Sequence, residues 1–474
     1  MSASPHVSGG FLKAFWQSLA LLCALGWSMG SCTPTEEEIT PDAGAMLRFE
    51  ADTVLFDTVF TQVGSITKRL KVYNPSKNAV RISEVRVGGL GSSAFQVYVN
   101  GMPGPQVQNL ELRGRDSLLV LVKATINPTS AEQPFLVQDS LLFSTNGNQQ
   151  KVKLVAYGQN ATYYKHNYTT APAETWTAAK AHVIYDSVTV PAGQTLTIEK
   201  GTQVYLHRRA KIKVQGTLLV EGEHEQRVVF QQVRQEDTYR NAPGQWQGLE
   251  FLPASQGNEI RYAEIKNAVT GIYLRAEGAT VPQVMLQNSF VRNMLQNGVL
   301  SHGGNLRLQN SMVANCGEYA LAGLGGGRYE IIFSTLANYA NEFIRLSPSF
   351  VFDEKWQANN NVVRQAPYHL IVLNSILWGR QDEELQFGAM GQSSSRIIRH
   401  SFLKTKAYVA EFDKLGNQLN VDPLFRDGPN SDFQIIKLSP ANAAGEPVAG
   451  ITLDYEDKAR DAAKPDAGAL EVDY

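Results

Sequence analysis

The chain has 474 residues, more than one ordinary domain of about 100–200 residues, which predicts two or three units. Hydrophobic residues make up 43% and charged residues 19%, proportions typical of a folded chain and not of a disordered one. The net charge of −2 leaves no basic surplus to neutralise a phosphate backbone, so nucleic acid is not an expected partner. Only one apolar stretch, near the N-terminus, could enter a membrane, which excludes a multi-span transporter.

Residues 1–31 have the layout of a secretory signal peptide. Lys13 precedes the short apolar run 14–27, and two small residues then lead to Cys32. This order resembles a bacterial lipoprotein signal. The resemblance implies cleavage before Cys32 and lipidation of that residue, so that the membrane becomes a partner through the N-terminal lipid.

A polar tether is expected over 32–44, and it contains the acidic cluster 36–38. The cluster is similar to the export tags of Bacteroidetes surface lipoproteins, which implies an outer-membrane protein exposed at the cell surface. The alternative is a plain solvated linker, which charge runs usually are. Loss of the leader and acylation of Cys32 would leave Cys316 as the only thiol, so no internal disulfide is expected.

The segment 45–158 alternates polar and apolar residues in short runs separated by turn signals. The turn pairs include Asn74-Pro75, Asn100-Gly101 and Asn146-Gly147. Alternation with turns every 8–12 residues predicts an antiparallel β-sandwich, and its size fits an immunoglobulin-like module. No cluster of histidines, cysteines or carboxylates is present in the segment, so it is expected to be a spacer.

Residues 182–415 form very short strands with no helical periodicity, after a linker or N-terminal cap over 159–181. Aligned repeats end on Asn267, Asn293, Asn315 and Asn338, at intervals of 26, 22 and 23 residues. A period near 22 without helices predicts a parallel β-helix, right-handed by the usual rule for crossovers. The four asparagines are expected to be structural, with their amides stacked as a ladder from coil to coil.

The repeat resembles the right-handed parallel β-helix superfamily, the pectate-lyase-like fold. The motif Gly-x-Trp-x-Gly at 244–248 often opens such repeats, and the tail over 416–474 is similar to their terminal segments, with Val421-Asp422-Pro423-Leu424-Phe425 and Pro465-Asp466-Ala467-Gly468-Ala469 as examples. The likeness covers about residues 180–474 and implies a fold whose members bind or cleave extended glycans. The fold class is therefore all-β: an N-terminal antiparallel β-sandwich, a right-handed parallel β-helix and a C-terminal cap expected to cover the final coil.

Neither catalytic pattern of this superfamily stands out. Lyases need a cation and a base, often with Ca²⁺, and hydrolases need neighbouring carboxylates. The segment Ser301-His302-Gly303-Gly304 is only loosely similar to the Gly-His-Gly of the hydrolases. An insertion over 348–364 interrupts the period, and loops that leave a solenoid often carry function.

Four residues of this insertion are the candidate ligand-binding set: Asp353, Glu354, Lys355 and Trp356. They could supply carboxylates, a cation and a ring on which a sugar can stack. The alternative is an excursion that packs its aromatic side chains back on the rod.

Two acidic groups could hold Ca²⁺, but charged turns explain both as well. The first is Asp382-Glu383-Glu384, and the second is Asp427, Asn430 and Asp432. No cofactor is therefore predicted, and Ca²⁺ stays open. Cys316 is interpreted as a small buried hydrophobic residue and Trp246 as packing on a coil edge.

Three functions remain open from the sequence. The first is a lipid-anchored cell-envelope protein that binds glycans through the β-helix without an active site. The second is a lyase or hydrolase of an acidic glycan that uses Lys355, Arg345 or Arg364 beside the insertion. The third is a purely structural envelope component.

Overall fold

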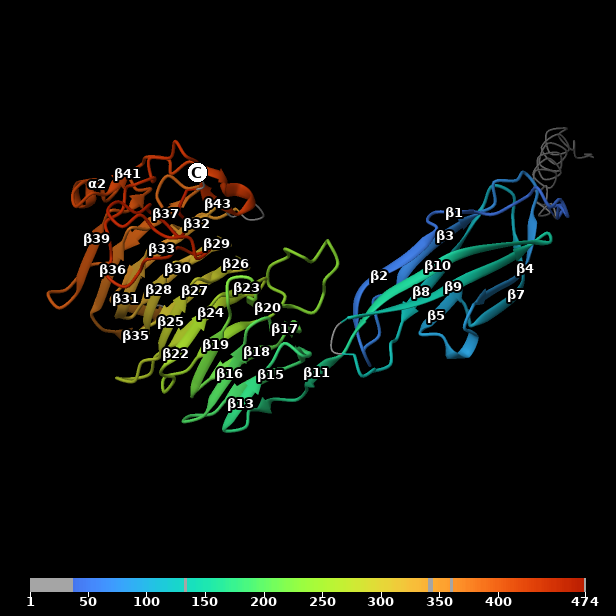
Figure 1. Cartoon of the computed structure of the whole chain (residues 1–474), viewed down its shortest axis with the longest axis horizontal. Coiled ribbons are helices and arrows are strands. Elements are labelled where there is room, and N and C mark those ends of the chain that lie inside the picture. The colour runs from blue at the N-terminus through green and yellow to red at the C-terminus, as the bar shows by residue number, and fades with distance from the viewer. Residues whose placement is uncertain (1–36, 132–133, 340–343, 359–360, 473–474) are drawn as a thin grey trace, which may run out of the picture. The chain divides into compact units, whose positions relative to one another are not determined.

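The computed structural model describes residues 37–131, 134–339, 344–358 and 361–472 (Figure 1). The leader and Cys32, and with them the predicted site of lipidation, lie outside the described residues. The chain divides into two compact units. One comprises the described residues up to Val54 with Thr67–Lys123 and Asp139–Leu154, and the other comprises Leu55–Ile66, Ala124–Gln138 and Val155 onward. In the part of the chain that the structure describes, no helix is long and apolar enough to span a membrane.

The N-terminal strands form two five-stranded sheets, as expected for a β-sandwich. In spatial order, the first sheet contains β1 (Arg48–Phe49), β3 (Lys68–Tyr73), β8 (Ser117–Ala124), β5 (Phe95–Val99) and β6 (Met102–Gly104). The second contains β2 (Thr53–Phe60), β10 (Asn148–Gln159), β9 (Phe135–Thr145), β4 (Val80–Val87) and β7 (Gln106–Leu112), and a 3-10 turn, η1 (Leu90–Ser92), follows β4. Antiparallel pairs include β3 with β8 in the first sheet and β4 with β7 and β9 in the second.

Turn chemistry explains two of the hairpins in this part of the chain. Asn100 and Gly101 both have positive φ, as do Asn146 and Gly147, which is the backbone that a tight hairpin turn requires. Asn74 is buried, and its amide donates to the carbonyls of Asn78, Leu112 and Arg113. The Asn-Gly and Asn-Pro pairs therefore lie in turns, as predicted from the sequence.

The C-terminal part is a parallel β-helix built from three long sheets, one strand of each per coil (Figure 1). The first β-helix sheet contains β11 (Ala161–Tyr164), β14 (Ala181–Ile184), β17 (Gln203–Leu206), β20 (Val228–Gln232), β23 (Ala263–Lys266), β26 (Phe290–Met294), β29 (Met312–Cys316), β32 (Thr335–Asn338), β37 (Ile376–Gly379), β40 (Phe402–Leu403) and β41 (Gln418–Leu419). The second contains β12 (Tyr168–Thr169), β15 (Ser187–Val190), β18 (Lys211–Val214), β21 (Gly248–Phe251), β24 (Thr270–Arg275), β27 (Asn297–His302), β30 (Leu321–Leu324), β33 (Phe350–Asp353) and β38 (Leu385–Phe387). The third contains β13 (Ala173–Trp176), β16 (Thr195–Glu199), β19 (Thr217–Glu221), β22 (Asn258–Arg261), β25 (Gln283–Gln287), β28 (Asn305–Gln309), β31 (Gly327–Ile332), β36 (Tyr368–Leu373) and β39 (Ser395–Arg399).

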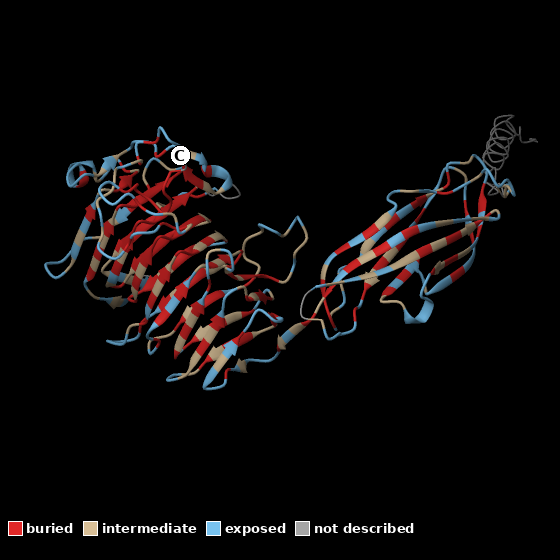
Figure 2. Ribbon diagram, in the orientation of Figure 1, coloured by how far each residue is buried: buried red, intermediate tan, exposed pale blue. Residues whose placement is uncertain are grey.

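The strands of the first coil, β11 to β13, lie in the segment that the sequence suggested as a linker or cap. Inward residues alternate with outward ones along every sheet, so one continuous apolar core runs through the coils, and Figure 2 shows the buried positions as repeated bands. Tyr164, Trp176 and His182 stack on one another at the N-terminal end of this core.

In six successive coils, from β22 to β40, a single left-handed residue turns the chain from the third β-helix sheet into the first. This turn column consists of Tyr262, Asn288, Asn310, Phe333, Asn374 and His400, all with φ between 46° and 51°. A single left-handed residue redirects the chain sharply, at a cost of about 1–2 kcal/mol for a residue other than glycine. The column therefore needs compensating contacts.

A ladder does run along the coils, but serine forms it. Ser289, Ser311, Ser334 and Ser375 are fully buried, and each backbone N–H donates to the serine hydroxyl of the next coil at 3.1–3.3 Å. The last of these bonds ends on Ser401. Each hydroxyl also donates to a carbonyl two residues back, for example Ser311 Oγ to Gln309 O at 2.8 Å.

The predicted asparagine column has other partners. Asn267, Asn293 and Asn315 have positive φ and so occupy turns, whereas Asn338 does not. Asn267 donates to Gln232 and Arg240 O, Asn293 to Asn241, and Asn315 to Ser431, while Asn338 both donates to and accepts from the Cys316 backbone. Within the described ranges, no hydrogen bond joins one of the four side chains to another, so the expected amide ladder is replaced by separate turn contacts.

Of the expected cap over 416–474, only the start covers the final coil, where β41 pairs with β40 and Leu419 packs on the core. The rest lies along the outer face of the first β-helix sheet. It contains β42 (Phe425–Asp427), η2 (Gly428–Asn430) and β43 (Asp432–Ile435), and its apolar side chains pack on outward residues of β29, β32, β37 and β40. The end of the core is also closed by the short helix α2 (Val409–Phe412) and by Tyr408, whose hydroxyl accepts the N–H of Phe387 at 2.9 Å.

The turn column is where this segment binds. The amides of Asn288, Asn310 and Asn374 donate to the carbonyls of Asp454, Leu453 and Glu446, each at 2.8 Å. Tyr262 donates to Asp457, and the ring of Phe333 lies 4.0 Å from the Arg460 guanidinium. The residues of the turn column, whose left-handed backbone is unfavourable, are thus stabilised by contacts with the C-terminal segment.

Candidate functional site

The insertion over 348–364 begins as a coil strand and then leaves the rod. β33 pairs in parallel with β30 and β38, and its Phe350 and Phe352 side chains belong to the core. The chain next forms an antiparallel hairpin of β34 (Lys355–Ala358) and β35 (Asn361–Gln365). The predicted ligand-binding residues lie where the hairpin departs from the coil.

Trp356 folds back on the second β-helix sheet and is half-buried there. Its ring stacks on the imidazole of His302, with centroids 3.9 Å apart and planes inclined by 16°. Nδ1 of His302 in turn lies 2.9 Å from the hydroxyl of Tyr273. The structure therefore joins two segments, the insertion and Ser301-His302-Gly303-Gly304, that the sequence pointed to separately.

Charged side chains continue this surface on the preceding coils. Glu250 lies 2.7 Å from Lys211 Nζ and 3.8 Å from Arg275 Nη1. Register pairs Glu250 with Tyr273 and Arg275 with His302 across neighbouring strands. We call this surface the His302 face and define it as Lys211, Lys213, Glu250, Tyr273, Arg275, His302 and Trp356.

Burial, together with a smaller effect of the nearby charge of Arg275, lowers the pKa of His302 from 6.5 to about 4. The imidazole is therefore neutral at pH 7 and is suited to stacking and hydrogen bonding. Burial also raises the pKa of the Tyr273 hydroxyl, so this group stays protonated. The face offers a neutral aromatic patch beside a row of ion pairs.

A depressed histidine pKa makes the stability of the fold depend on pH. Stability supplied by neutral His302 is fully present above pH 6.5 and is lost as the pH falls through about 4. We expect His302→Gln to reduce the fall in unfolding free energy between pH 7.5 and 4.5 by about 2–3 kcal/mol, measured by denaturant unfolding of both proteins. An equal fall in wild type and variant would contradict this assignment, since all other titrating groups are common to the two.

The acidic residues of the insertion stabilise the local backbone. Glu354 accepts the N–H of Gly391 at 2.6 Å and the hydroxyl of Ser394 at 2.5 Å, and these bonds lower its pKa. Asp353 accepts the N–H of Lys355 at 2.8 Å, and Lys355 itself is exposed. Of the four predicted ligand-binding residues, only Trp356 is in the His302 face.

The two arginines proposed for a lyase or hydrolase are engaged elsewhere. Arg345 forms a buried ion pair with Glu384, with Nη2 and Oε1 2.6 Å apart, and the exposed fractions of the side chains are 2% and 1%. A Cβ at Gly379 would lie 2.1 Å from this carboxylate oxygen, which explains why the repeat has glycine there. Arg364 donates to the carbonyls of Gly325 and Gly278.

The two acidic groups considered for Ca²⁺ are divided among separate contacts. Asp382 pairs with Lys406 at 2.6 Å, and Glu383 accepts the N–H groups of Lys406 and Ala407. Asp427 accepts from the Asn430 amide and Asp432 pairs with Arg426. Within the described residues, no three histidine, cysteine or carboxylate side chains converge as a metal site would require.

Two further residues have structural roles. Cys316 is buried, as predicted, and burial raises its thiol pKa to about 12, so the thiol is unreactive. Trp246 does not pack on a coil edge but lies fully inside the core, where its indole N–H donates to Lys266 O at 2.8 Å.

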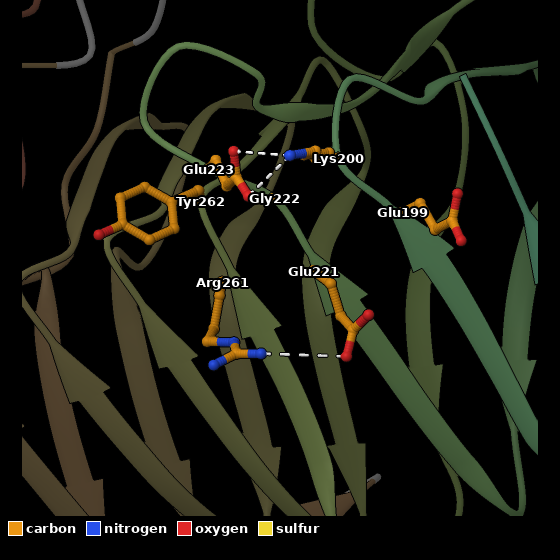
Figure 3. A pocket seen from close by; sticks show the side chains of 7 residues that line it. All are labelled: Glu199, Lys200, Glu221, Gly222, Glu223, Arg261 and Tyr262. Carbon is orange, nitrogen blue, oxygen red and sulfur yellow. Dashed lines mark hydrogen bonds and ion pairs between the residues drawn. The ribbon is translucent and has the colours of Figure 1, made fainter. Parts of the chain in front are cut away.

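A cavity of about 620 Å³ opens at the turn between the third and first β-helix sheets (Figure 3). Its lining residues are Glu199, Lys200, Glu221, Gly222, Glu223, Arg261 and Tyr262. Lys200 pairs with Glu223 at 2.9 Å and Arg261 with Glu221 at 3.9 Å, so most of its charges are matched within the wall. Tyr262 is the one aromatic residue among those that line the cavity, and its hydroxyl donates to Asp457.

No protein-family model matches the chain. No curated protein matches its sequence either. Among solved structures, a family 123 glycoside hydrolase from Clostridium perfringens is 9% identical over 26% of each chain, with a TM-score of 0.19. A protein of unknown function from Porphyromonas gingivalis W83 is 12% identical over 28% of this chain and 58% of that one, also with a TM-score of 0.19. The matched region spans about a quarter of the hydrolase, and similarities this weak assign no activity.

Proposed function

We propose that the protein is an exported, lipid-anchored component of the cell envelope that binds a glycan through the His302 face. The anchor is supported by the sequence around Cys32, and the acidic residues after it support display on the cell surface. The β-sandwich then serves as a spacer that carries the β-helix. Membrane attachment and glycan binding are thus functions of different parts of the chain.

The observation that carries the glycan proposal is the stack of Trp356 on His302. A half-buried aromatic ring held flat by a second ring is a rigid apolar platform, and the apolar face of a sugar ring packs well on such a surface. The hydrogen bond between the Tyr273 hydroxyl and Nδ1 of His302 fixes the imidazole in place. The platform therefore needs little reorganisation when a ligand binds.

The polar part of the face suits an extended ligand. Lys213, Glu250 and Tyr273 occupy matched positions on three successive strands, spaced by about 4.8 Å from coil to coil. Their side chains could hydrogen-bond hydroxyl groups along a polysaccharide, while Trp356 would provide the apolar contact. An enzymatic function would need in addition a paired acid and base. Of the cations that we proposed for it from the sequence, Arg345 and Arg364 have other partners, and Lys355 is exposed.

We expect Trp356→Ala to weaken binding to any polysaccharide that the wild-type protein binds by about 10- to 100-fold. The reason is that loss of an aromatic anchor costs on the order of 1–3 kcal/mol of binding free energy. Affinity electrophoresis against a panel of neutral and acidic polysaccharides measures this, with reducing ends and the ultraviolet absorbance of unsaturated uronates followed in parallel. Trp356 belongs to an excursion outside the main coil, so the fold should persist.

The matched control is Tyr157→Ala, which removes an exposed aromatic ring in the β-sandwich and should leave binding unchanged. Equal binding by wild type and Trp356→Ala would reject the His302 face as the site. New reducing ends would establish catalysis, and their appearance together with uronate absorbance would identify a lyase in place of a binding protein.

A further inference from the structure

Two cations lie side by side on the outer face of the first β-helix sheet. Register pairs Lys266 of β23 with Arg292 of β26. Their side chains are largely buried, with exposed fractions of 14% and 26%. Like charges on neighbouring strands repel each other, and burial weakens the screening by solvent. An arrangement of this kind is stabilised when a negative charge is placed between the two groups.

The chain itself supplies too little negative charge here. Among the described residues, Glu264 is the only carboxylate within salt-bridge distance of either cation, at 2.5 Å from Arg292 and 3.8 Å from Lys266. Burial raises the pKa of Glu264, but three cations, Arg292, Lys266 and Arg227, together hold it below its ordinary value. Three positive charges thus surround one negative charge.

Arg227 adds to the positive charge, because the groups that it contacts are neutral and do not offset its own charge. It donates to the carbonyls of Asn288 and Tyr455, and its guanidinium lies 4.1 Å from the Tyr455 ring. Lys266 binds Glu264 less closely than Arg292 does, because Lys266 Nζ lies 3.8 Å from the carboxylate, whereas Arg292 donates to it from both Nε and Nη2. Burial lowers the pKa of the Lys266 amine, and Arg292 and Arg240 lower it further against the opposing effect of Glu264.

The surrounding backbone is well fixed on both sides of this pair. Trp246 donates to the carbonyl of Lys266, and Asn267 next to it donates to the carbonyl of Arg240, which belongs to the long connection between β20 and β21. On the other side, Tyr455 of the C-terminal segment is held against Arg227. The strand positions from which the two cations project are therefore fixed.

We propose that Lys266 and Arg292 form a binding site for an oxyanion, the carboxylate or phosphate group of a ligand. The anion bridges the Lys266 amine and the guanidinium of Arg292, and it neutralises the excess positive charge that Glu264 leaves. The site is separate from the His302 face, because β23 and β26 belong to the first β-helix sheet and the His302 face to the second. It stands whether or not the His302 face binds a glycan.

Isothermal titration of the full chain with inorganic phosphate and with acetate, at constant ionic strength in chloride, tests the proposal. Wild type should bind at least one of the two anions saturably, and Lys266→Met should weaken that binding about tenfold or more. Lys151→Met removes an exposed lysine of β10, outside both proposed sites, and should bind as wild type does. Preference for phosphate identifies a phosphate ester as the ligand group, and preference for acetate identifies a carboxylate.

A second measurement needs no variant. Acylation of the wild-type protein by an amine-reactive reagent, read out by peptide mass, should modify Lys266 more slowly when the bound anion is present. The proposal is overturned if neither anion binds saturably, if Lys266→Met retains the wild-type affinity, or if the anion leaves acylation of Lys266 unchanged.

Discussion

Gly248→Ala should lower the free energy of unfolding by about 3–5 kcal/mol, enough to remove much of the stability of an ordinary domain. Gly248 begins β21 with φ of 126°, a backbone conformation that residues with a Cβ rarely adopt. A Cβ built there would lie 1.7 Å from the carbonyl oxygen of Thr270 on the next coil. The contact is with backbone, so no side-chain movement relieves it and neighbouring coils must separate.

Gly278→Ala is the matched control. Gly278 also has positive φ, at 56°, but a Cβ there would meet nothing within 4 Å. Its substitution should cost only the backbone strain, about 1–2 kcal/mol. Unfolding in guanidinium chloride compares the two variants, and equal losses of stability would show that the close approach of the coils at Gly248 is unimportant.

The same observation explains the Gly-x-Trp-x-Gly motif. Gly244 and Gly248 both have positive φ, and between them Trp246 enters the core as one of its largest fully buried side chains. The motif therefore serves to bring an indole into the coil and to let the next strand begin against its neighbour. Its resemblance to other β-helix repeats predicted the fold, whereas the interior position of the indole needed the three-dimensional structure.

Sequence periodicity predicted the architecture because short strands and turns are local features. The alternation in 45–158 and the repeat in 182–415 correspond to two sheets of a sandwich and three sheets of a β-helix. Contacts between the coils and the C-terminal segment could not be predicted in this way. The Asn-Ser pairs at Asn288, Asn310 and Asn374 are visible in the repeat, but their side chains bind residues 446–454, far along the chain.

The candidate site was predicted only in part, for a similar reason. The interruption of the period indicated the insertion and Trp356, whereas His302 lay in a segment with only a loose similarity to the Gly-His-Gly of the hydrolases. Their stacking depends on how far the hairpin of β34 and β35 folds back, which no spacing in the sequence specifies. The charged residues of the insertion looked equally promising, yet Glu354 accepts hydrogen bonds from a neighbouring loop.

The second large effect is expected at Arg460, which joins the C-terminal segment to the turn column. Its guanidinium donates to Glu471 at 2.8 Å, to Asn310 Oδ1 at 3.0 Å and to the carbonyls of Gly468 and Ala469. Its side chain is only 2% exposed. Burial lowers the pKa of Arg460, while Glu471 and other nearby carboxylates raise it, so the pair is strongly interdependent.

Arg460→Met should therefore destabilise the protein by about 3–5 kcal/mol, because it leaves the buried carboxylate of Glu471 without its cation. Burial and the charge of Asp466 already raise the pKa of Glu471. The C-terminal segment should exchange its amide hydrogens and be cut by proteases faster than the coils beneath it. Lys406→Met, which breaks the exposed pair with Asp382, should leave both measurements close to wild type.

The double variant Arg460→Met/Glu471→Leu separates the charge effect from loss of packing. Since it removes the stranded carboxylate together with its partner, it should recover a large part of the stability that Arg460→Met loses. Recovery accompanied by renewed protection of residues 446–460 would show that the unpaired carboxylate of Glu471, and not the loss of the other Arg460 contacts, releases the segment in Arg460→Met. If instead the two substitutions destabilise additively, the hydrogen bonds of Arg460 to Asn310 and to the backbone carbonyls hold the segment, and Glu471 contributes little.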